Sequence, residues 1–203
     1  LLSFPWRQFN LSSAFDPAML AKSQTEEAAM QGQVAFGKME EVIFGKPVAE
    51  AAPALIDRLG ASRVFIMCSG TLNRETSAVS DLASALGDRV VGIFDDMPAH
   101  TPREAVIAAT KSARAARADL ILTFGGGSVT DGAKAVQLCL ANDITDAAAM
   151  DALRVPPGAA NSDCEPPTLR QVSIPTTLSA GEFTSLSGVT DERTKTKELF
   201  KHP

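Results

Sequence analysis

Apolar and polar residues follow one another along the chain in a pattern that predicts short buried strands separated by helices. Compact apolar runs are typical of strands that are covered on both faces of a parallel sheet. Five such runs predict strands at 42–44, 63–68, 90–94, 119–124 and 171–174. Between them, apolar residues recur at helical spacing. The four helices that this spacing predicts begin near Pro47, Asn73, Pro102 and Val129. Strands alternating with helices predict an α/β fold with right-handed crossovers and helices on both faces of a parallel sheet.

The two ends of the chain differ from this regular middle. The first 32 residues read as an N-terminal extension, with a possible helix from Asp16 or Pro17 to about Met30. Near the other end, proline and glycine predict a loop over 155–170. Residues 185–190 and 195–200, joined by a turn at 191–193, predict a C-terminal β-ribbon.

Charge and cysteine content narrow the possible partners. The chain has 203 residues, with 19 Lys and Arg against 24 Asp and Glu, and lacks a basic run, which argues against nucleic acid as the main partner. No apolar run approaches the roughly 20 residues of a membrane span, so no membrane partner is expected. The three cysteines are odd in number and lack a Cys-x-x-Cys spacing. This pattern excludes a disulfide framework and favours a reducing, cytoplasmic compartment.

Histidine content narrows the possible chemistry. The sequence has two histidines, His100 and His202. A metal centre built from two or three histidines of this chain is therefore nearly excluded, and we predict no metal ligands. A lone histidine makes neither a metal site nor a catalytic dyad, so we expect His100 to be solvent-exposed or to cap the helix that follows it.

The strongest chemical signal is a glycine run, Gly125-Gly126-Gly127-Ser128, between a predicted buried strand and a predicted helix. Glycines let backbone N–H groups approach an anion closely. The following helix adds about half a positive charge at its N-terminus. Ser128 is expected to cap that helix and to donate to a phosphate oxygen. A tight turn whose glycines serve packing only is the alternative. Phosphate binding is favoured, because open α/β sheets bind ligands at the carboxyl ends of their strands.

Two further groups of polar residues adjoin this loop in the predicted fold. Asp131 and Lys134 are three residues apart on one helical face, and this spacing alone favours a surface ion pair of little energetic value. The segment from Thr176 to Thr184 follows the last predicted strand of the sheet, and its hydroxyl groups can line the same crevice. Taken alone it is a weak signal, because Ser/Thr-rich turns are usually only turns.

The two segments together carry a family resemblance. The pattern Gly-Gly-Gly-Ser-x-x-Asp-x-x-Lys at 125–134, followed by Pro-Thr-Thr at 175–177, resembles the iron-containing alcohol dehydrogenase family. Glycerol dehydrogenases and dehydroquinate synthases share that family's fold, which is Rossmann-like. The resemblance covers most of residues 40–203. Shorter matches lie at 44–45, 70–72, 98–102 and 189–191, and His100-Thr101-Pro102 is similar to the maleylacetate reductase branch, which works without metal.

The resemblance implies a nicotinamide cofactor, NAD or NADP, a small-molecule substrate and a homodimer. The cofactor-binding residues that it implies are Ser69, Gly125, Gly126, Gly127, Ser128, Asp131, Thr176, Thr177, Ser179, Thr184 and Lys197. The glycine run and Ser128 would hold the pyrophosphate, with Asp131 beside them. The two threonines would contact the adenosine or phosphate side. Ser179 and Thr184 would flank the nicotinamide end, and Lys197 would approach the ribose.

Two departures from the family pattern shape the expectation. Many NAD-using members carry an Asp where Ser69 stands. A serine does not repel a 2′-phosphate, so NADP is as admissible a cofactor as NAD.

Metal-using members hold iron or zinc with an Asp and three histidines in a helical C-terminal domain, and the sequence shows no such motif. Residues 33–203 are therefore expected to form a dinucleotide-binding domain without the helical metal-binding domain. Fe or Zn would be needed only if that domain is present, and the catalytic residues stay unknown.

The expected activity is NAD(P)-dependent oxidoreduction between a small alcohol and its aldehyde or ketone. Three alternatives stay open. One is a metal-free maleylacetate-type reductase. Another is a nucleotide-binding fragment without turnover. The third is a lyase or cyclase of the dehydroquinate synthase type, which uses NAD transiently.

Overall fold

The computed structural model describes residues 32–34, 39–155 and 163–201. The possible helix near residues 16–30 and part of the loop predicted over 155–170 lie outside the described residues. The chain divides into two compact units, Leu1–Gly45 and Lys46–Pro203. In the first, strand β1 (Gly32–Val34) pairs antiparallel with β2 (Val42–Phe44), which lies at its predicted place. The domain boundary predicted after residue 32 stays a prediction.

The second unit contains a four-stranded parallel sheet in the order β4-β3-β5-β6. Its strands are β3 (Val64–Cys68), β4 (Val90–Phe94), β5 (Leu120–Gly125) and β6 (Arg170–Pro175). Its α-helices are α2 (Val48–Leu59), α3 (Gly70–Glu75), α4 (Ala78–Leu86), α5 (Arg103–Ala115) and α6 (Gly127–Ala141). Short 3-10 helices are η1 (Gly87–Arg89), η2 (Ala149–Leu153) and η3 (Gly181–Phe183). The predicted parallel α/β fold is confirmed.

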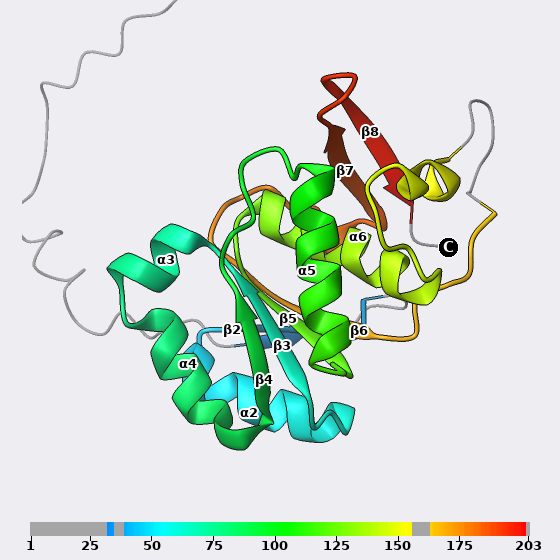
Figure 1. Cartoon of the computed structure of the whole chain (residues 1–203). Coiled ribbons are helices and arrows are strands. Elements are labelled where there is room, and N and C mark those ends of the chain that lie inside the picture. The colour runs from blue at the N-terminus through cyan, green and yellow to red at the C-terminus, as the bar shows by residue number, and fades with distance from the viewer. Residues whose placement is uncertain (1–31, 35–38, 156–162, 202–203) are drawn as a thin grey trace, which may run out of the picture. The chain divides into compact units, whose positions relative to one another are not determined.

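Helices cover both faces of this sheet, because alternate residues of its central strands point to opposite sides. Phe65, Met67 and Ile121 are buried in one hydrophobic cluster with residues of α5 and α6. Ile66 and Leu122 are buried in a second cluster with residues of α2 and α4. Figure 1 shows the sheet between these two helical layers. None of the helices in the described segments is long and apolar enough to cross a bilayer.

The two central strands, β3 and β5, lead into helices on opposite faces of the sheet. After β3 the chain passes through α3 and α4 to the edge strand β4, whereas after β5 it passes through α6 to the other edge strand, β6. The carboxyl ends of β3 and β5 therefore form a topological switch point. Ligands of open α/β sheets bind in the crevice at such a point.

The helix predicted to start at Asn73 is wrong in one respect, because the structure divides it into α3 and α4. Ser69, not Asn73, is the N-cap of α3. Thr76 is extended, with φ −138° and ψ 165°. Its hydroxyl donates to the carbonyl of Leu72 and accepts the N–H of Ala78. The β-branched threonine thus satisfies backbone groups of both helices and separates them.

The predicted C-terminal ribbon is confirmed as an antiparallel pair, β7 (Leu186–Asp191) and β8 (Thr196–Lys201). An unexpected feature is that Arg103, the first residue of α5, lies fully buried against this ribbon and its neighbours. Its guanidinium pairs with Glu198 and, at 2.7 Å, with Asp151. It also lies 5.8 Å from the centre of the Phe200 ring. A buried charge is tolerated because these carboxylates surround it.

Candidate functional site

The loops after β3 and β5 meet at the switch point. The N–H of Ser69 donates to the carbonyl of Phe124 at 2.9 Å. A Cβ added to Gly125 would lie 3.2 Å from the Ser69 nitrogen and 2.8 Å from Val129. The structure therefore brings Ser69 together with the glycine run, two of the segments that the sequence analysis singled out. The glycine is needed at this place because no side chain fits between the two loops.

The other two glycines of the run face a second segment, the loop that follows β6. A Cβ on Gly126 would lie 3.1 Å from Thr177, and a Cβ on Gly127 would lie 3.1 Å from Ser179. None of the three glycines has a positive φ; among the described glycines that conformation occurs at other positions. Their role is thus close packing of three loop segments. This agrees with the packing alternative, and it also leaves the backbone bare where the segments meet.

The start of α6 is open towards this meeting point. Its N-cap is Gly126, which offers no side-chain cap bond, and its first turn contains no acidic residue. First-turn N–H groups of a helix lack intrahelical acceptors, and the helix dipole adds positive charge there. A helix of this length with an uncapped, uncharged start is suited to hold an anion.

Ser128 does not cap α6, so that part of the prediction is wrong. The helix begins at Gly127, not at Val129, which places Ser128 inside the first turn. Its hydroxyl oxygen accepts the backbone N–H of His100 at 3.1 Å. The physical reason is that the loop before α5 crosses the start of α6 and brings a donor to the serine. The hydroxyl proton is thereby left to donate elsewhere, which suits a phosphate oxygen.

The segment from Thr176 to Ser179 packs directly against the glycine run. The N–H of Thr176 donates to the carbonyl of Gly125 at 3.0 Å, so this segment continues the backbone pairing of β5 and β6. Beside it lies an open hollow of about 440 Å³. Its lining residues are Pro175, Thr176, Thr177, Leu178, Ala180, Glu182 and Phe183. Leu178 is fully exposed and Phe183 is half exposed. This segment therefore offers an apolar surface near the N-terminus of α6.

Asp131 and Lys134 connect α6 to the ribbon. Asp131 accepts the N–H of Gly188 at 3.0 Å. Lys134 donates to Asp131 at 3.1 Å and to the carbonyl of Leu186 at 2.6 Å. The two residues do form an ion pair, but the predicted surface location is wrong, because Lys134 is only 6% exposed. The two side chains satisfy the edge of β7, a partner that lies more than 50 residues away in the sequence.

Thr184 lies just before the ribbon, and Lys197 lies within it, in β8. The Thr184 hydroxyl accepts the N–H of Leu186 at 3.1 Å. The Lys197 side chain lies across Gly188, where a Cβ would come 2.9 Å from its Nζ. Because Gly188 also donates to Asp131, the lysine belongs to the part of the ribbon that adjoins α6. The cofactor roles of both residues stay predictions.

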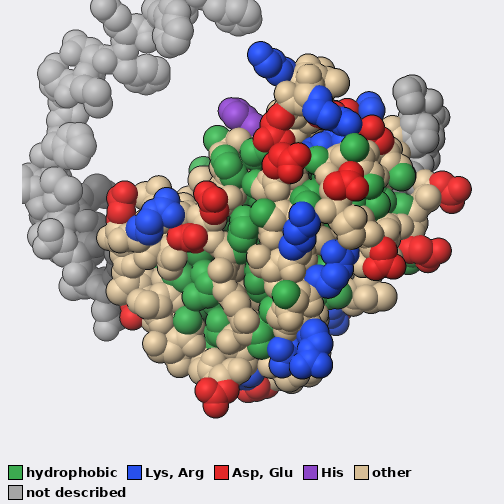
Figure 2. Space-filling model, in the orientation of Figure 1, with side chains coloured by type: hydrophobic (Ala, Val, Ile, Leu, Met, Phe, Trp, Pro, Cys, Tyr) green, Lys and Arg blue, Asp and Glu red, His purple; other side chains and the backbone are tan. Residues whose placement is uncertain are grey.

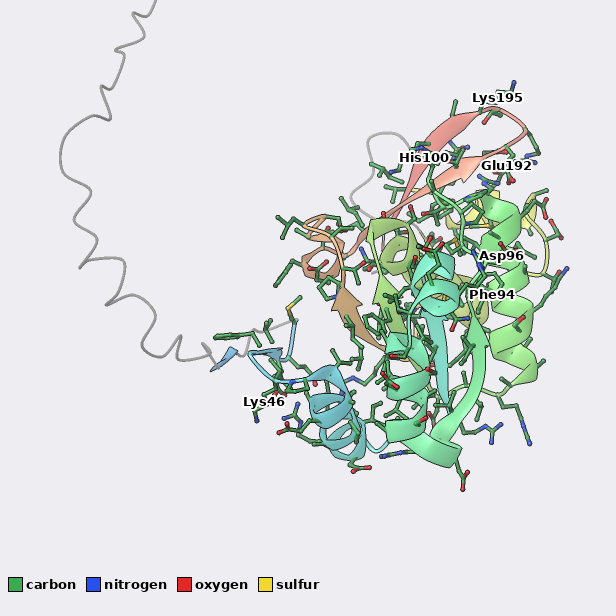
Figure 3. All side chains as sticks on the ribbon, turned by 90° about the vertical axis from the view of Figure 1, so that its left-hand side faces the viewer. Lys46, Phe94, Asp96, His100, Glu192 and Lys195 are labelled. Atoms are coloured by element: carbon green, nitrogen blue, oxygen red, sulfur yellow. The ribbon has the colours of Figure 1, made fainter. Side chains whose placement is uncertain are left out.

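A strained loop that the sequence analysis weighed only through its histidine also adjoins the site. His100 and Thr101 both have positive φ, 67° and 54°. The Thr101 hydroxyl donates to the carbonyl of Ser128 at 3.1 Å, and Thr190 donates to the carbonyl of His100 at 2.8 Å. The His100 side chain is exposed, as expected, at the base of the ribbon (Figure 3). Strain of this kind persists where surrounding contacts hold it, and it is enriched at functional sites.

The Cys68 thiol and a cluster of three carboxylates could also take part in chemistry, but their surroundings argue against it. Burial, helped by the charge of Asp95, raises the pKa of the Cys68 thiol to about 11, so it is no nucleophile at neutral pH. Asp151, Asp191 and Glu198 place carboxylate oxygens within 4.8 Å of one another. The Arg103 guanidinium already supplies a cation to this cluster, and we assign no metal to it.

The fold and this crevice define a class of protein. A parallel sheet with helices on both faces, in which a glycine-lined helix starts at the switch point, is typical of Rossmann-like domains. Comparison with known families makes the assignment specific. The profile of the family "Iron-containing alcohol dehydrogenase" matches residues 40–203. The chain belongs to the iron-containing alcohol dehydrogenase family.

Individual relatives agree with this family. The chain is 35% identical over 163 residues to a dehydrogenase of Gibberella moniliformis, covering 77% of this chain and 38% of the relative. A crystal structure of maleylacetate reductase from Agrobacterium tumefaciens is 30% identical, with a TM-score of 0.56, over 77% of this chain and 35% of the other. Sulfoacetaldehyde reductase from Bifidobacterium kashiwanohense, solved in complex with NAD+, shares the fold with a TM-score of 0.67 at 21% identity, over 78% of this chain and 40% of the other. The chain thus spans well under half the length of these proteins.

Proposed function

We propose that the protein binds NAD or NADP at the switch point and belongs to an oxidoreductase that interconverts a small alcohol and its aldehyde or ketone. The observation that carries this proposal is the open start of α6, walled by Gly125, Gly126 and Gly127 where the carboxyl ends of β3 and β5 meet. The relatives are dehydrogenases and reductases, which supports hydride transfer as the reaction class.

The start of α6 suits a pyrophosphate, because its first-turn N–H groups lack intrahelical acceptors and its N-cap offers no side-chain bond. The missing side chains of Gly126 and Gly127 let Thr177 and Ser179 pack closely against this helix start. The Ser128 hydroxyl has its acceptor role filled by His100 and keeps a proton to donate. These features favour a dinucleotide whose central phosphates lie at the start of α6.

The remaining residues of the site would orient the cofactor. The open hollow bounded by Thr177, Leu178 and Phe183 gives an apolar wall against which a planar ring can stack. The Thr177 and Ser179 hydroxyls lie beside the glycine backbone and can donate to phosphate or ribose oxygens. When bound, the nicotinamide supplies or accepts the hydride, and the chain's own share is binding and orientation.

Iron does not fit the described residues. The only group of three possible ligands found in the described part of the chain is Asp151, Asp191 and Glu198, and Arg103 lies among them. A cation next to a guanidinium would be repelled. We therefore derive no step through a metal, and any metal dependence of the whole protein would rest on other residues.

A metal-free maleylacetate-type reductase is the second candidate. It is supported by the similarity to maleylacetate reductases, such as the one from Cupriavidus pinatubonensis at 31% identity over 150 residues. It is also consistent with the strained His100-Thr101 loop, which is fixed against the phosphate-binding helix. For either reaction we propose a small-molecule substrate and a homodimer.

Ser128→Asp tests the proposed cofactor site. A carboxylate in the first turn of α6 still accepts a hydrogen bond from the His100 N–H. Its negative charge also interacts favourably with the positive end of the helix dipole, so we expect the variant to fold. The same charge repels pyrophosphate, and we expect NADH and NADPH affinity to fall by more than about tenfold, because one like charge costs roughly 1.4 kcal/mol or more at such a site. Cofactor fluorescence during titration measures the dissociation constants.

The matched control is Ser80→Asp, which adds the same charge to the exposed first turn of α4. It should leave both affinities unchanged. Circular dichroism checks that Ser128→Asp and the parent are both folded. Equal cofactor affinities of the two folded proteins would contradict the proposed site. Absence of binding in the parent itself would contradict the proposed function.

A further inference from the structure

Two neighbouring residues directly before α5 hold a backbone conformation that ordinary side chains avoid. His100 and Thr101 have φ values of 67° and 54°. In this left-handed region the Cβ atom crowds the backbone, and the conflict is larger for a β-branched residue such as threonine. Thr101 is only 1% exposed, so the turn lies against other parts of the protein. A conformation of this kind persists where neighbouring groups hold it.

One residue of the ribbon holds the carbonyls of this strained pair. The backbone N–H of Thr190, in β7, donates to the carbonyl of Thr101 at 2.9 Å. The hydroxyl of the same threonine donates to the carbonyl of His100 at 2.8 Å. Thr190 also forms an isolated parallel bridge with Pro102. Any residue except proline can supply the backbone bond at position 190, whereas the bond to His100 needs a side-chain donor.

The other side of the strained pair contacts the first turn of α6. The N–H of His100 donates to the Ser128 hydroxyl oxygen at 3.1 Å, and the Thr101 hydroxyl donates to the Ser128 carbonyl at 3.1 Å. A path of hydrogen bonds therefore joins Thr190 to Ser128 through two residues. Because His100 takes one lone pair of the Ser128 oxygen, the hydroxyl proton is confined to directions away from that N–H.

The ribbon is a firm support for this path, because ion pairs fix it next to Thr190. Asp191, the following residue, pairs with Arg193 at 2.7 Å and lies 3.8 Å from the buried guanidinium of Arg103. Figure 2 shows acidic and basic side chains gathered at this end of the molecule. A displacement of β7 would separate these charges, so the ion pairs keep Thr190 in place against the strain of the turn.

We propose that Thr190 is a positioning residue for the cofactor. Its hydroxyl holds the His100-Thr101 turn so that the Ser128 hydroxyl stays aimed at a phosphate at the start of α6. The inference rests on the proposed cofactor site and gives Thr190 itself no contact with the cofactor. A side chain that is already oriented loses less conformational entropy when the ligand binds. Without the Thr190 hydroxyl, the turn relaxes, and Ser128 has to be oriented at the moment of binding.

The experiment measures cofactor affinity in variants of the whole protein, by fluorescence titration with NADH and NADPH. Thr190→Val keeps the shape of the side chain and removes only its hydroxyl. We expect both affinities to fall by about three- to tenfold, the range of one hydrogen bond. The two factors should be equal, because the two cofactors share the pyrophosphate. Thr190→Ser keeps the hydroxyl and should restore both affinities to within about twofold of the parent.

A double-mutant cycle shows whether the effect passes through Ser128. Ser128→Ala removes the hydroxyl that the path positions and should itself weaken the binding of both cofactors. In that background Thr190→Val should change the affinities by less than about twofold, because no hydroxyl is left to orient. A residue that only stabilised the fold would lower the affinity equally in both backgrounds.

Thr110→Val is the matched control. Thr110 lies buried in α5, and its hydroxyl also donates to a backbone carbonyl at 2.8 Å, that of Val106. The substitution removes the same kind of bond and should leave both affinities unchanged. Thermal unfolding checks that the variants fold, and Thr190→Ala removes the same hydroxyl if Thr190→Val does not fold.

The outcomes separate this inference from the proposed function. Equal losses of NADH and NADPH affinity in Thr190→Val that vanish in the Ser128→Ala background support the inference. Unchanged affinities in Thr190→Val, a loss for one cofactor only, or the same loss in both backgrounds would overturn it and leave the dinucleotide site in place. A parent that binds neither cofactor contradicts the proposed function, and the inference fails with it.

Discussion

Ser69 shows how one side chain can serve both the fold and the site. Its hydroxyl accepts the Leu72 N–H at the start of α3, at 3.5 Å, and its own N–H pairs with Phe124. Asp and Ser are about equally good at the N-cap of a helix. The position can therefore take a carboxylate without loss of local structure, which makes the residue a clean probe of cofactor preference.

Ser69→Asp should shift preference towards NAD. The carboxylate can accept from both ribose hydroxyls of NADH and repels a 2′-phosphate, so the ratio of NADPH to NADH affinity should fall by about tenfold or more, equivalent to roughly 1.4 kcal/mol. Fluorescence titration with both cofactors measures the ratio. The prediction fails if mutant and parent have equal ratios.

At the scale of elements, polar links that include two sets of charged side chains fix the β-ribbon to the domain. Asp131 and Lys134 join it to α6, and Arg103 joins it to α5 and η2. Hydrogen bonds from Arg103 and Arg193 hold the pKa of Asp151 below its usual range, and Arg193 does the same for Asp191. Groups with lowered native pKa values stabilise the fold above the pKa of the unfolded state and lose that effect as the pH falls.

Arg103→Met should destabilise the protein by about 2–3 kcal/mol near pH 7, because the buried carboxylates of Asp191 and Glu198 lose their buried cation and keep only the half-exposed Arg193 and Arg154. The difference from the parent should shrink as the pH falls below about 4, the usual range of an Asp, since protonation removes the carboxylate charges that Arg103 stabilises. Urea unfolding at several pH values measures the free energy of unfolding. A difference that stays constant between pH 7 and pH 3 would argue against the ion pairs as its cause.

At the scale of the whole Lys46–Pro203 unit, the proposed ligand lies between loops that belong to opposite helical layers. The β3 loop leads into the α3–α4 side and the β5 loop into the α6 side. A dinucleotide that spans them contacts the native arrangement and has no equivalent site in the unfolded chain. Binding should therefore stabilise the unit by mass action.

NADPH at about 100 times its dissociation constant should raise the free energy of unfolding by about 2.7 kcal/mol. Thermal or urea unfolding with increasing cofactor measures this, and the gain should follow the logarithm of the concentration. The Ser128→Asp variant, which is expected to fold and to bind at least tenfold more weakly, should gain no more than about 1.4 kcal/mol at the same concentration. A gain of equal size in that variant would place the ligand elsewhere.

Much of the fold and part of the site could be predicted from the sequence. Strand positions, most helix ends and the glycine run depend on local periodicity and on residues such as Gly60, whose φ of 68° ends α2. The division of the helix at Thr76 was missed because a side chain that bonds to its own backbone leaves the apolar spacing intact. The cap role predicted for Ser128 was wrong because the helix begins one residue before it and the Ser128 hydroxyl accepts from His100, which approaches from another loop.

The sequence by itself determined the secondary structure, the parallel sheet and the loop that faces the switch point, because these follow from short-range spacing and from the geometry of strands joined by helices. Only the tertiary structure decided the partners of the charged groups. Lys134 is buried under the ribbon, Arg103 lies among three carboxylates, and Arg74 lies over Gly70 beside Asp95. Each partnership joins residues from different elements, and electrostatic energy depends on distance and burial in space, which spacing along the chain does not encode.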